Sequence, residues 1–350
     1  MKTLRTIVVV LLVLAILITV VACGEKDPVV KPTETDDGNK KLLSFAVVAS
    51  DTIGDRGFND MSDVGIKQAA KDFKIEYKVF SCNQDASIFL DTLKTAAENY
   101  DVIFVVPGYF FDAEIVEVQK LYPDKTYIYV DGTTELEGVH GCTFAQHEGA
   151  FLAGCLAAYL TTQTSIDMIN EEKIVGFVGG FDMPVIHDYE EGFTQGVAYA
   201  DPTVKAIVRY AGDHYNAELG KTTATTSFRE GADVIFQAAG PTGLGILEAA
   251  EENKFYAIGV DTDQGYMHPG FIVSSMMKRV DIAVYDIVKK CCDGEALPKN
   301  LVYNVANGGI SLAENEEYKR IVPADIQQKV TDIANKIAAG EIVVKSYFDE

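Results

Sequence analysis

The sequence predicts an α/β protein made of two doubly wound lobes of parallel sheet that are joined by a hinge. Three observations support this fold class. Short apolar runs alternate with amphipathic helical segments from Leu42 onward, the second half of the chain repeats the order of the first half, and 350 residues exceed the length at which a single hydrophobic core usually stops growing. Two facing lobes therefore explain the pattern better than one very wide sheet.

Nine apolar runs have the length and composition of strands, and the segments between them have the period of helices. The predicted strands are residues 43–49, 75–80, 102–106, 126–130, 173–178, 203–210, 234–237, 256–260 and 271–275. Residues 60–73 and 148–160 are examples of the predicted helices. We expect the first lobe to contain residues 42–142 and 276–305, and the second lobe to contain residues 143–275 and 306–350.

The N-terminus has the pattern of an export signal. Lys2 and Arg5 precede an apolar run over residues 7–21, which is shorter than the roughly 20 residues of a membrane-spanning helix. Residues 1–22 are therefore predicted to be a signal peptide. The Val-Val-Ala-Cys sequence that ends at Cys23 resembles a bacterial lipobox, in which this cysteine is lipidated; an ordinary signal peptide with an incidental cysteine is the alternative.

Residues 23–41 are rich in Pro, Thr, Asp and Gly and have no apolar period, which is typical of a disordered tether. The whole chain is acidic, with 30 Lys plus Arg against 52 Asp plus Glu and a formal net charge of −22. Because nucleic acids and anionic lipid surfaces are bound by clustered Lys and Arg, this balance argues against both as partners. A membrane contact is expected only through the lipid.

The cysteines give no sign of a metal site. Besides Cys23 there are five, with no Cys-x-x-Cys spacing and no paired histidine, so neither a metal nor a cofactor is predicted. The adjacent Cys291 and Cys292 fit a pair of small apolar residues at a helix end, with a vicinal disulfide as the alternative.

Polar residues gather where predicted strands end. In doubly wound sheets ligands bind beyond the carboxyl ends of the strands, so these loops are where a site is expected. The loop over residues 51–60 follows the first strand and contains Asp51, Phe58 and Asn59. Phe58 does not fit the apolar period of the next helix. Taken alone, Phe58 could simply pack on that helix and Asn59 could cap it.

Two carboxylates and one cation follow strands of opposite lobes. Asp131 comes after the fourth predicted strand, Asp261 after the eighth and Lys278 after the ninth. Carboxylates from both lobes could accept paired hydrogen bonds from a polyhydroxylated ligand, and Lys278 could balance their charge. Helix caps and a solvated lysine are the alternatives for each residue taken alone.

Six short blocks, in their order and spacing, resemble the basic membrane protein family of substrate-binding lipoproteins over nearly the whole mature chain. This family serves ATP-driven nucleoside importers and has the type I periplasmic-binding-protein fold, which the resemblance implies here. The blocks are GDRGFN at residues 54–59, EGAFLAG at 148–154, VGGFDMP at 178–184, EGF at 191–193, AGPTGLG at 239–245 and IGVDTDQ at 258–264.

The resemblance implies a role for each residue on the base side of a nucleoside. Phe58 matches an aromatic residue that stacks on the face of a purine, and Asn59 matches an amide that hydrogen-bonds the edge of the base. Asp131 matches a carboxylate that contacts the base, with Asp51 as its neighbour. His214 stands where the family commonly has a second aromatic ring.

On the sugar side, the resemblance implies that Asp261 accepts hydrogen bonds from the ribose hydroxyls and that Lys278 reaches the same sugar. Gly240 would allow the backbone to approach the ligand closely. Tyr215 follows His214 and could replace it as the second ring after a small shift of the loop.

The function that the resemblance implies is capture and delivery of a nucleoside on the extracytoplasmic face of the cell membrane. The partners would be ABC permease subunits with a separate ATPase, since this chain has no Gly-x-x-x-x-Gly-Lys-Ser/Thr loop. The same fold could instead bind a flavin, a sugar or a signalling molecule for uptake or sensing. Catalysis is not expected, because no Gly-x-Ser-x-Gly motif is present and the residues after Asp263 do not continue a nucleoside hydrolase's aspartate cluster.

Overall fold

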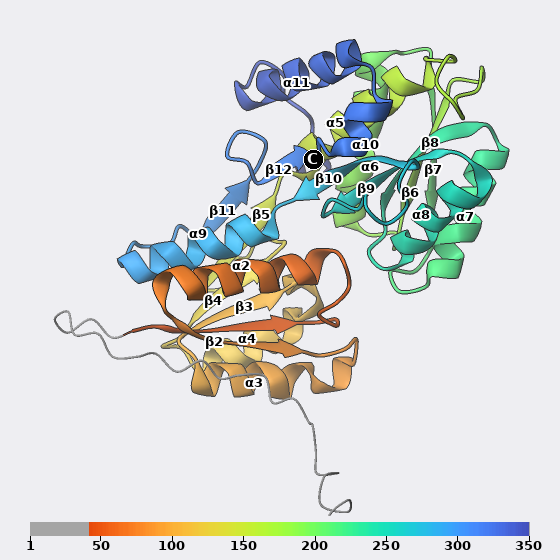
Figure 1. Ribbon diagram of the computed structural model, residues 1–350. Coiled ribbons are helices and arrows are strands. Elements are labelled where there is room, and N and C mark those ends of the chain that lie inside the picture. Colours follow the sequence, from red (N-terminus) through yellow and green to blue (C-terminus); the bar gives the residue numbers. More distant parts are fainter. Residues whose placement is uncertain (1–41, 350) are drawn as a thin grey trace, which may run out of the picture. The chain divides into compact units, whose positions relative to one another are not determined.

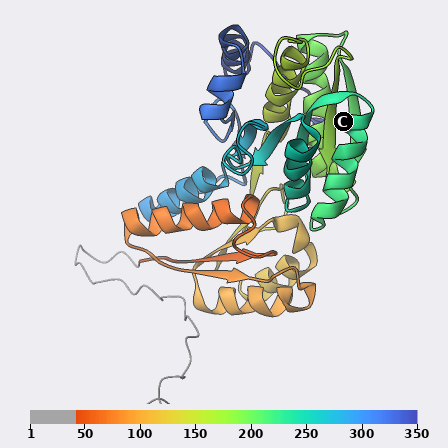
Figure 2. The same cartoon turned by 45° about the vertical axis from the view of Figure 1, so that its right-hand side comes forward.

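The structure is a computed structural model in which residues 42–349 are described. The predicted signal peptide, Cys23 and the tether lie outside these residues. The described residues form two α/β lobes, each with its own six-stranded sheet and with helices on both faces of the sheet (Figure 1). Figure 2, a view turned by 45°, shows the two sheets in separate lobes.

The sheet of the first lobe has the strand order β11-β5-β4-β3-β1-β2, and all its strands are parallel. The interior strand β1 is completely buried from Phe45 to Ala49, as expected where helices cover both faces of a parallel sheet. The strands are β1 Ser44–Ala49, β2 Glu76–Ser81, β3 Val102–Val106, β4 Thr126–Val130, β5 Val139–Phe144 and β11 Asn300–Tyr303.

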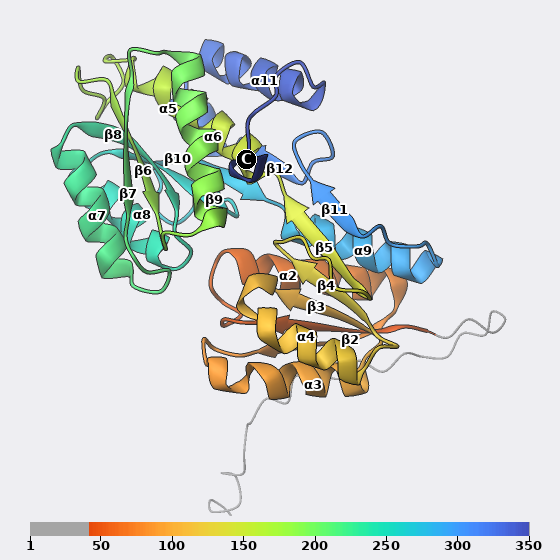
Figure 3. The same ribbon diagram turned by 180° about the vertical axis from the view of Figure 1, so that it is seen from behind.

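Side chains of β1 alternate between two apolar cores. Phe45 and Val47 pack on the side of α2 and α9, whereas Ala46 and Val48 pack on the side of α3 and α4. Figure 3 shows these two pairs of helices on opposite faces of the sheet. Gly65 lets α2 and α9 meet, because a Cβ there would lie 2.6 Å from the Asp281 carbonyl oxygen. The helices of this lobe are α2 Phe58–Phe73, α3 Phe89–Asn99, α4 Asp112–Leu121, α9 Val280–Asp293 and the short 3-10 turns η1 Ala86–Ile88 and η2 Gly108–Phe110.

The sheet of the second lobe has the matching order β12-β10-β9-β8-β6-β7, but its edge strand β12 runs antiparallel to β10. The strands are β6 Ile174–Gly179, β7 Lys205–Tyr210, β8 Ala232–Ala238, β9 Tyr256–Asp261, β10 Ile272–Lys278 and β12 Ile310–Leu312. The helices are α5 Gln146–Thr161, α6 Pro184–Ala200, α7 Ala217–Arg229, α8 Thr242–Asn253, α10 Glu316–Ile321, α11 Ala324–Ala338 and the 3-10 turn η3 Tyr347–Asp349.

Helices α5 and α6 pack backbone to backbone in the second lobe. A Cβ on Gly154 would lie 2.2 Å from the Phe193 carbonyl oxygen, and one on Gly192 would lie 2.1 Å from the His147 carbonyl oxygen. Any side chain at these two positions would force the helices apart. Two of the glycine-containing blocks noted in the sequence therefore serve helix packing.

The predicted α/β class is confirmed, and each of the nine predicted strands corresponds to a strand of the structure. Strands β5, β11 and β12 were not predicted. β5 contains His140 and Gly141 and so has no continuous apolar run, while β11 and β12 have only four and three residues. β5 continues to Phe144 in the first sheet and β10 to Lys278 in the second, so both strands extend past the lobe boundaries expected from the sequence.

Candidate functional site

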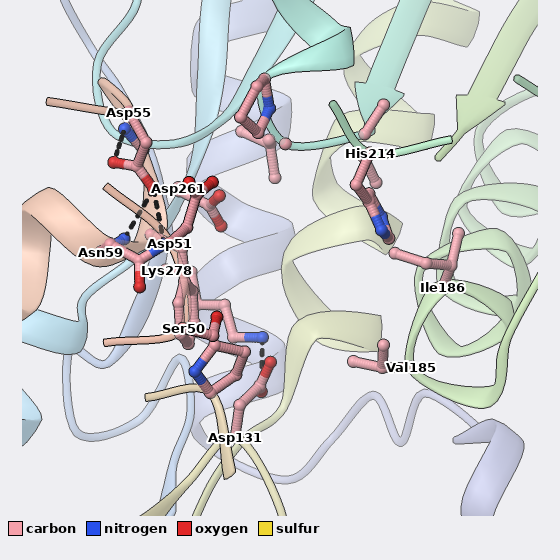
Figure 4. Close-up of a pocket in the computed structure, with 18 of the residues that line it drawn as sticks. Ser50, Asp51, Asp55, Asn59, Asp131, Val185, Ile186, His214, Asp261 and Lys278 are labelled. Carbon is pink, nitrogen blue, oxygen red and sulfur yellow. Dashed lines mark hydrogen bonds and ion pairs between the residues drawn. The ribbon is translucent and has the colours of Figure 1, made fainter. Parts of the chain in front are cut away.

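A cavity lies between the two lobes at the carboxyl ends of their strands, with about 770 Å³ of empty space including its mouth (Figure 4). This position is typical of small-molecule sites in open α/β sheets. All eight residues predicted to bind a ligand line it. They are Asp51, Phe58, Asn59, Asp131, His214, Gly240, Asp261 and Lys278.

The loop after β1 is held by the carboxylate of Asp55. Its Oδ1 accepts hydrogen bonds from the backbone N–H of Gly57 and of Asp60, and its Oδ2 accepts from the backbone N–H of Asn59. These are the N–H groups at the start of α2 that have no partner within the helix. Burial raises the pKa of Asp55, and these hydrogen bonds oppose the rise. The result is a fixed position for Phe58, the first residue of α2.

Aromatic rings reach the cavity from both lobes. Phe58 comes from the first lobe, and His214 comes from the loop after β7 in the second lobe, with its ring edge-to-face against Phe181 at 4.7 Å between centroids. Burial lowers the pKa of His214 to about 4, so its imidazole is neutral at neutral pH. The neighbouring Tyr215 also lines the cavity, and the structure therefore brings both candidate second rings to the same wall.

Asp131 and Lys278 form a buried ion pair between the lobes. Lys278 Nζ lies 2.6 Å from Asp131 Oδ1, and the two side chains are 2% and 6% exposed respectively. The same ammonium lies 5.2 Å from the ring centroids of Phe58 and Phe144 and 5.5 Å from that of Tyr189. Such rings stabilise a cation through their negative faces. The end of β4 is thus joined to the end of β10.

Asp261 is a buried carboxylate that accepts no hydrogen bond from any other described side chain or backbone group. Burial raises its pKa to about 7; Lys278 opposes this shift, while Asp55 and Asp131 add to it. Its φ of 66° places it in the left-handed region, which non-glycine residues seldom adopt and which is often found at functional sites. Asp261 is therefore an acceptor that the protein itself leaves unsatisfied.

Asp51 and Gly240 are the remaining predicted residues. Asp51 already has hydrogen-bond partners within the protein, and Gly240 is notable for its backbone conformation. Oδ1 of Asp51 accepts hydrogen bonds from the N–H and hydroxyl of Thr52 and from Nε2 of Gln84 at 2.6, 2.9 and 2.8 Å. Gly240, two residues after the end of β8, adopts a φ of 54°, a conformation that glycine takes without strain. A Cβ on Gly240 would lie 3.5 Å from the His214 carbonyl oxygen, an ordinary contact distance, so the positive φ and not a lack of space favours glycine here.

Several lining residues were not predicted from the sequence. Asp55 is one, and Tyr109, Val185, Ile186 and Tyr189 are others. These four follow β3 and β6, so the rule that ligands lie beyond strand ends would have found them if it had been applied to every strand. Burial raises the pKa of Tyr189 well above its usual range, which keeps its phenol neutral.

Two α/β lobes with a cavity between the ends of their strands define the class of two-lobed substrate-binding proteins. A solute-binding protein of an ABC transporter system from Aeropyrum pernix shares this fold, with a TM-score of 0.77, 26% sequence identity, and coverage of 87% of this chain and 94% of that one. The model of the family "ABC transporter substrate-binding protein PnrA-like" matches residues 42–347, and the chain belongs to this family.

Relatives with curated names support the same assignment. Basic membrane protein D of Borreliella burgdorferi is 28% identical over 324 residues, which cover 90% of this chain and 92% of the relative. The ABC transporter nucleoside-binding protein BmpA of Lactococcus lactis is 28% identical over 319 residues, covering 85% of this chain and 88% of the relative. The resemblance to the basic membrane proteins is thus confirmed.

Two further observations concern residues 42–349 as a whole. In this part of the chain, no three or more His, Cys, Asp or Glu side chains are grouped in a way that could hold a metal ion. None of the helices described here combines the length and the apolar character needed to cross a bilayer.

Proposed function

We propose that this chain is the extracytoplasmic, lipid-anchored receptor of an ABC importer and that it binds a nucleoside, preferably a purine nucleoside, in the cavity between its lobes. The observation that carries the proposal is the lining of one cavity by rings from both lobes and by a buried carboxylate without a protein partner. The name of the lactococcal relative supports the ligand class.

The base would lie between the two walls that carry Phe58 and His214. Both rings are neutral at neutral pH, and base stacking on an aromatic side chain contributes about 1–3 kcal/mol. Asn59 Oδ1 and Ser50 Oγ are buried and find no hydrogen-bond partner among the described residues. They would supply polar contacts on the side of the cavity that carries Phe58. A flat heterocycle with polar edges satisfies both features at once.

The ribose would satisfy Asp261. A carboxylate can accept from two neighbouring hydroxyl groups, and the two hydroxyls of a ribose match this capacity. A sugar that lacks them leaves the carboxylate buried and unpaired, which is costly. We therefore expect discrimination against deoxynucleosides on this side of the cavity.

Closure of the lobes would then distinguish the ligand-bound protein from the free protein for the permease. In addition to the Lys278 and Asp131 pair, the Thr262 hydroxyl of the second lobe donates to the Arg56 carbonyl oxygen of the first lobe at 3.1 Å. Hinge closure of this kind is a common response of two-lobed binding proteins to their ligands. The closed protein would dock on permease subunits whose separate ATPase drives import, while the lipid on Cys23 keeps it at the membrane.

The proposal is tested by identifying, through mass spectrometry, the small molecule that co-purifies with the protein, and by calorimetric titration with inosine, adenosine, guanosine and cytidine. We expect binding of at least one nucleoside without release of free base, and loss of that binding in Asp261→Ala. Asp325→Ala, which alters an exposed carboxylate on α11, is the matched control and should bind as the parent does. A co-purified flavin or sugar, together with no heat from any nucleoside, would refute the nucleoside assignment.

A further inference from the structure

The side-chain amide of Asn59 is engaged on one side only. Its Nδ2 donates to Asp55 Oδ2 at 2.9 Å, as the dashed lines between the two residues in Figure 4 show. Its Oδ1 is buried and has no hydrogen-bond partner among the described residues, although Asn59 lines the ligand cavity. A buried acceptor without a partner is costly and calls for an explanation.

Asp55 determines which way round this amide lies. Its carboxylate accepts four hydrogen bonds, from the backbone N–H groups of Gly57, Asn59 and Asp60 and from Asn59 Nδ2. An ionised carboxylate only accepts hydrogen bonds, whereas an asparagine amide donates through nitrogen and accepts through oxygen. Turning the amide over would set two oxygens against each other. The nitrogen therefore stays on Asp55 and the oxygen is the atom left for a ligand.

Two other polar residues near Asn59 in the cavity, Asp51 and Ser50, can also accept a hydrogen bond from a ligand. Asp51 also lines the cavity and, as a carboxylate, can only accept. Ser50 Oγ, buried and unpartnered, can both accept and donate. A ligand edge that offers an N–H group suits all three residues, whereas an edge that offers only lone pairs suits Ser50 alone.

We propose that Asp55 is a positioning residue that fixes the polarity of Asn59, so that the site selects nucleosides whose base presents an N–H donor to α2. This inference rests on the proposed function and narrows its ligand class. Bases with an N–H or amino group on that edge are accepted, and a purine that carries only ring nitrogens with lone pairs there is rejected.

The test compares inosine and adenosine with purine riboside, which has the same ribose and ring system but no N–H group on the six-membered ring. Leaving the Asn59 oxygen unpaired should weaken binding of purine riboside roughly 10- to 100-fold. In Asp55→Asn the new amide can donate as well as accept, so Asn59 is free to turn and the ratio should fall to within about threefold. Asp60→Asn is the matched control, because Asp60 accepts from the backbone of Gly54 and Arg56 and does not contact Asn59.

A second measurement does not depend on nucleoside binding. In protein with isotope-labelled asparagine, the side-chain NH₂ signal of Asn59, assigned by its loss in Asn59→Ser, should exchange slowly with solvent in the parent and in Asp60→Asn, and rapidly in Asp55→Asn. Rapid exchange in the parent would overturn the inference, even if no nucleoside bound and the proposed function had failed. Equal affinities for inosine and purine riboside in the parent, or an unchanged ratio in Asp55→Asn, would overturn it while leaving nucleoside binding intact.

Discussion

Asp131 and Asp261 occupy equivalent places in the two lobes but differ in what surrounds them. The sheet orders correspond strand by strand, so that β4 of the first sheet matches β9 of the second. Asp131 directly follows β4 with a φ of 70°, and Asp261 ends β9 with a φ of 66°. Asp131 has Lys278 at 2.6 Å, whereas Asp261 has no hydrogen-bonding partner in the described protein.

The comparison shows that the same backbone conformation places a carboxylate at a strand end in both lobes. The two carboxylates differ in whether the protein provides a hydrogen-bonding partner. A left-handed aspartate at a strand end is uncommon, and it persists only when the surrounding structure holds it. In the first lobe the protein satisfies this carboxylate with its own cation and uses it to join the lobes. In the second lobe the carboxylate has no hydrogen-bonding partner among the described residues, and we propose that the ligand supplies one.

The largest effect that sharpens this comparison is expected from Lys278→Met. Removing one partner of a buried ion pair typically costs about 3–5 kcal/mol, because the remaining charge stays buried. We expect a loss of this size in the free energy of unfolding of the ligand-free protein, measured by urea denaturation.

Two controls separate charge from packing in this experiment. The double variant Lys278→Met with Asp131→Asn removes the stranded charge and should recover much of the lost stability. Lys221→Met, in an exposed ion pair with Glu248 and Glu252, should change little. If Lys278→Met behaved like Lys221→Met, the pair would not stabilise the fold.

The sequence predicted that Asp51, Asp131 and Asp261 reach the cavity, but it missed Asp55 and did not predict how the carboxylates are paired. Lys278 was expected to balance both Asp131 and Asp261; it forms a hydrogen-bonded ion pair with Asp131 and only lowers the pKa of Asp261 through its charge. The choice depends on where the end of β10 meets the end of β4 at the cavity, which is a property of two lobes packed together. Strand ends can be predicted from apolar runs, whereas distances between lobes cannot.

The sequence also did not predict whether a given block serves helix packing or lines the cavity. Gly154 and Gly192 belong to blocks that carry the family resemblance as clearly as Phe58 and Asp261 do. The structure places the two glycines between α5 and α6 and the other two residues in the cavity. Asp55 shows the reverse case, since an acidic residue in a loop is ordinarily solvated, and only its four hydrogen bonds identify its part in positioning Asn59.

A smaller effect should appear in the pH dependence of stability. The pKa of Asp261 is about 7 in the folded protein, against about 4 for an unfolded aspartate. Between these values the folded state binds more protons than the unfolded state, so the free energy of unfolding falls as the pH rises. From pH 5 to pH 8 we expect the ligand-free parent to lose about 2–3 kcal/mol more than Asp261→Asn does.

Urea denaturation of the two proteins at four pH values between 5 and 8 measures this difference. Asp233, whose pKa burial raises to about 6, titrates in the same window, but it is present in both proteins and cancels in the comparison. Parallel curves would mean that Asp261 carries no buried charge, and the contrast with Asp131 would be lost.

The smallest effect concerns the ligand itself. Ribose hydroxyls that donate to Asp261 stabilise its ionised form, so the bound protein should hold this carboxylate at a lower pKa than the free protein does. Binding then releases a proton below pH 7, and the affinity for a nucleoside should be about tenfold weaker at pH 6 than at pH 8. His214, with a pKa of about 4, stays neutral throughout this range and does not contribute.

Calorimetry at pH 6 in two buffers of different ionisation enthalpy counts the released protons. We expect close to one released proton per bound nucleoside at pH 6 and almost none at pH 8. A 2′-deoxynucleoside should release as many protons as the ribonucleoside only if a single hydroxyl reaches Asp261. The exposed-site variant Asp325→Ala should release protons as the parent does. An affinity that stays constant from pH 6 to pH 8 would mean that binding does not change the pKa of this carboxylate, and it would refute the proposed contact between the sugar and Asp261.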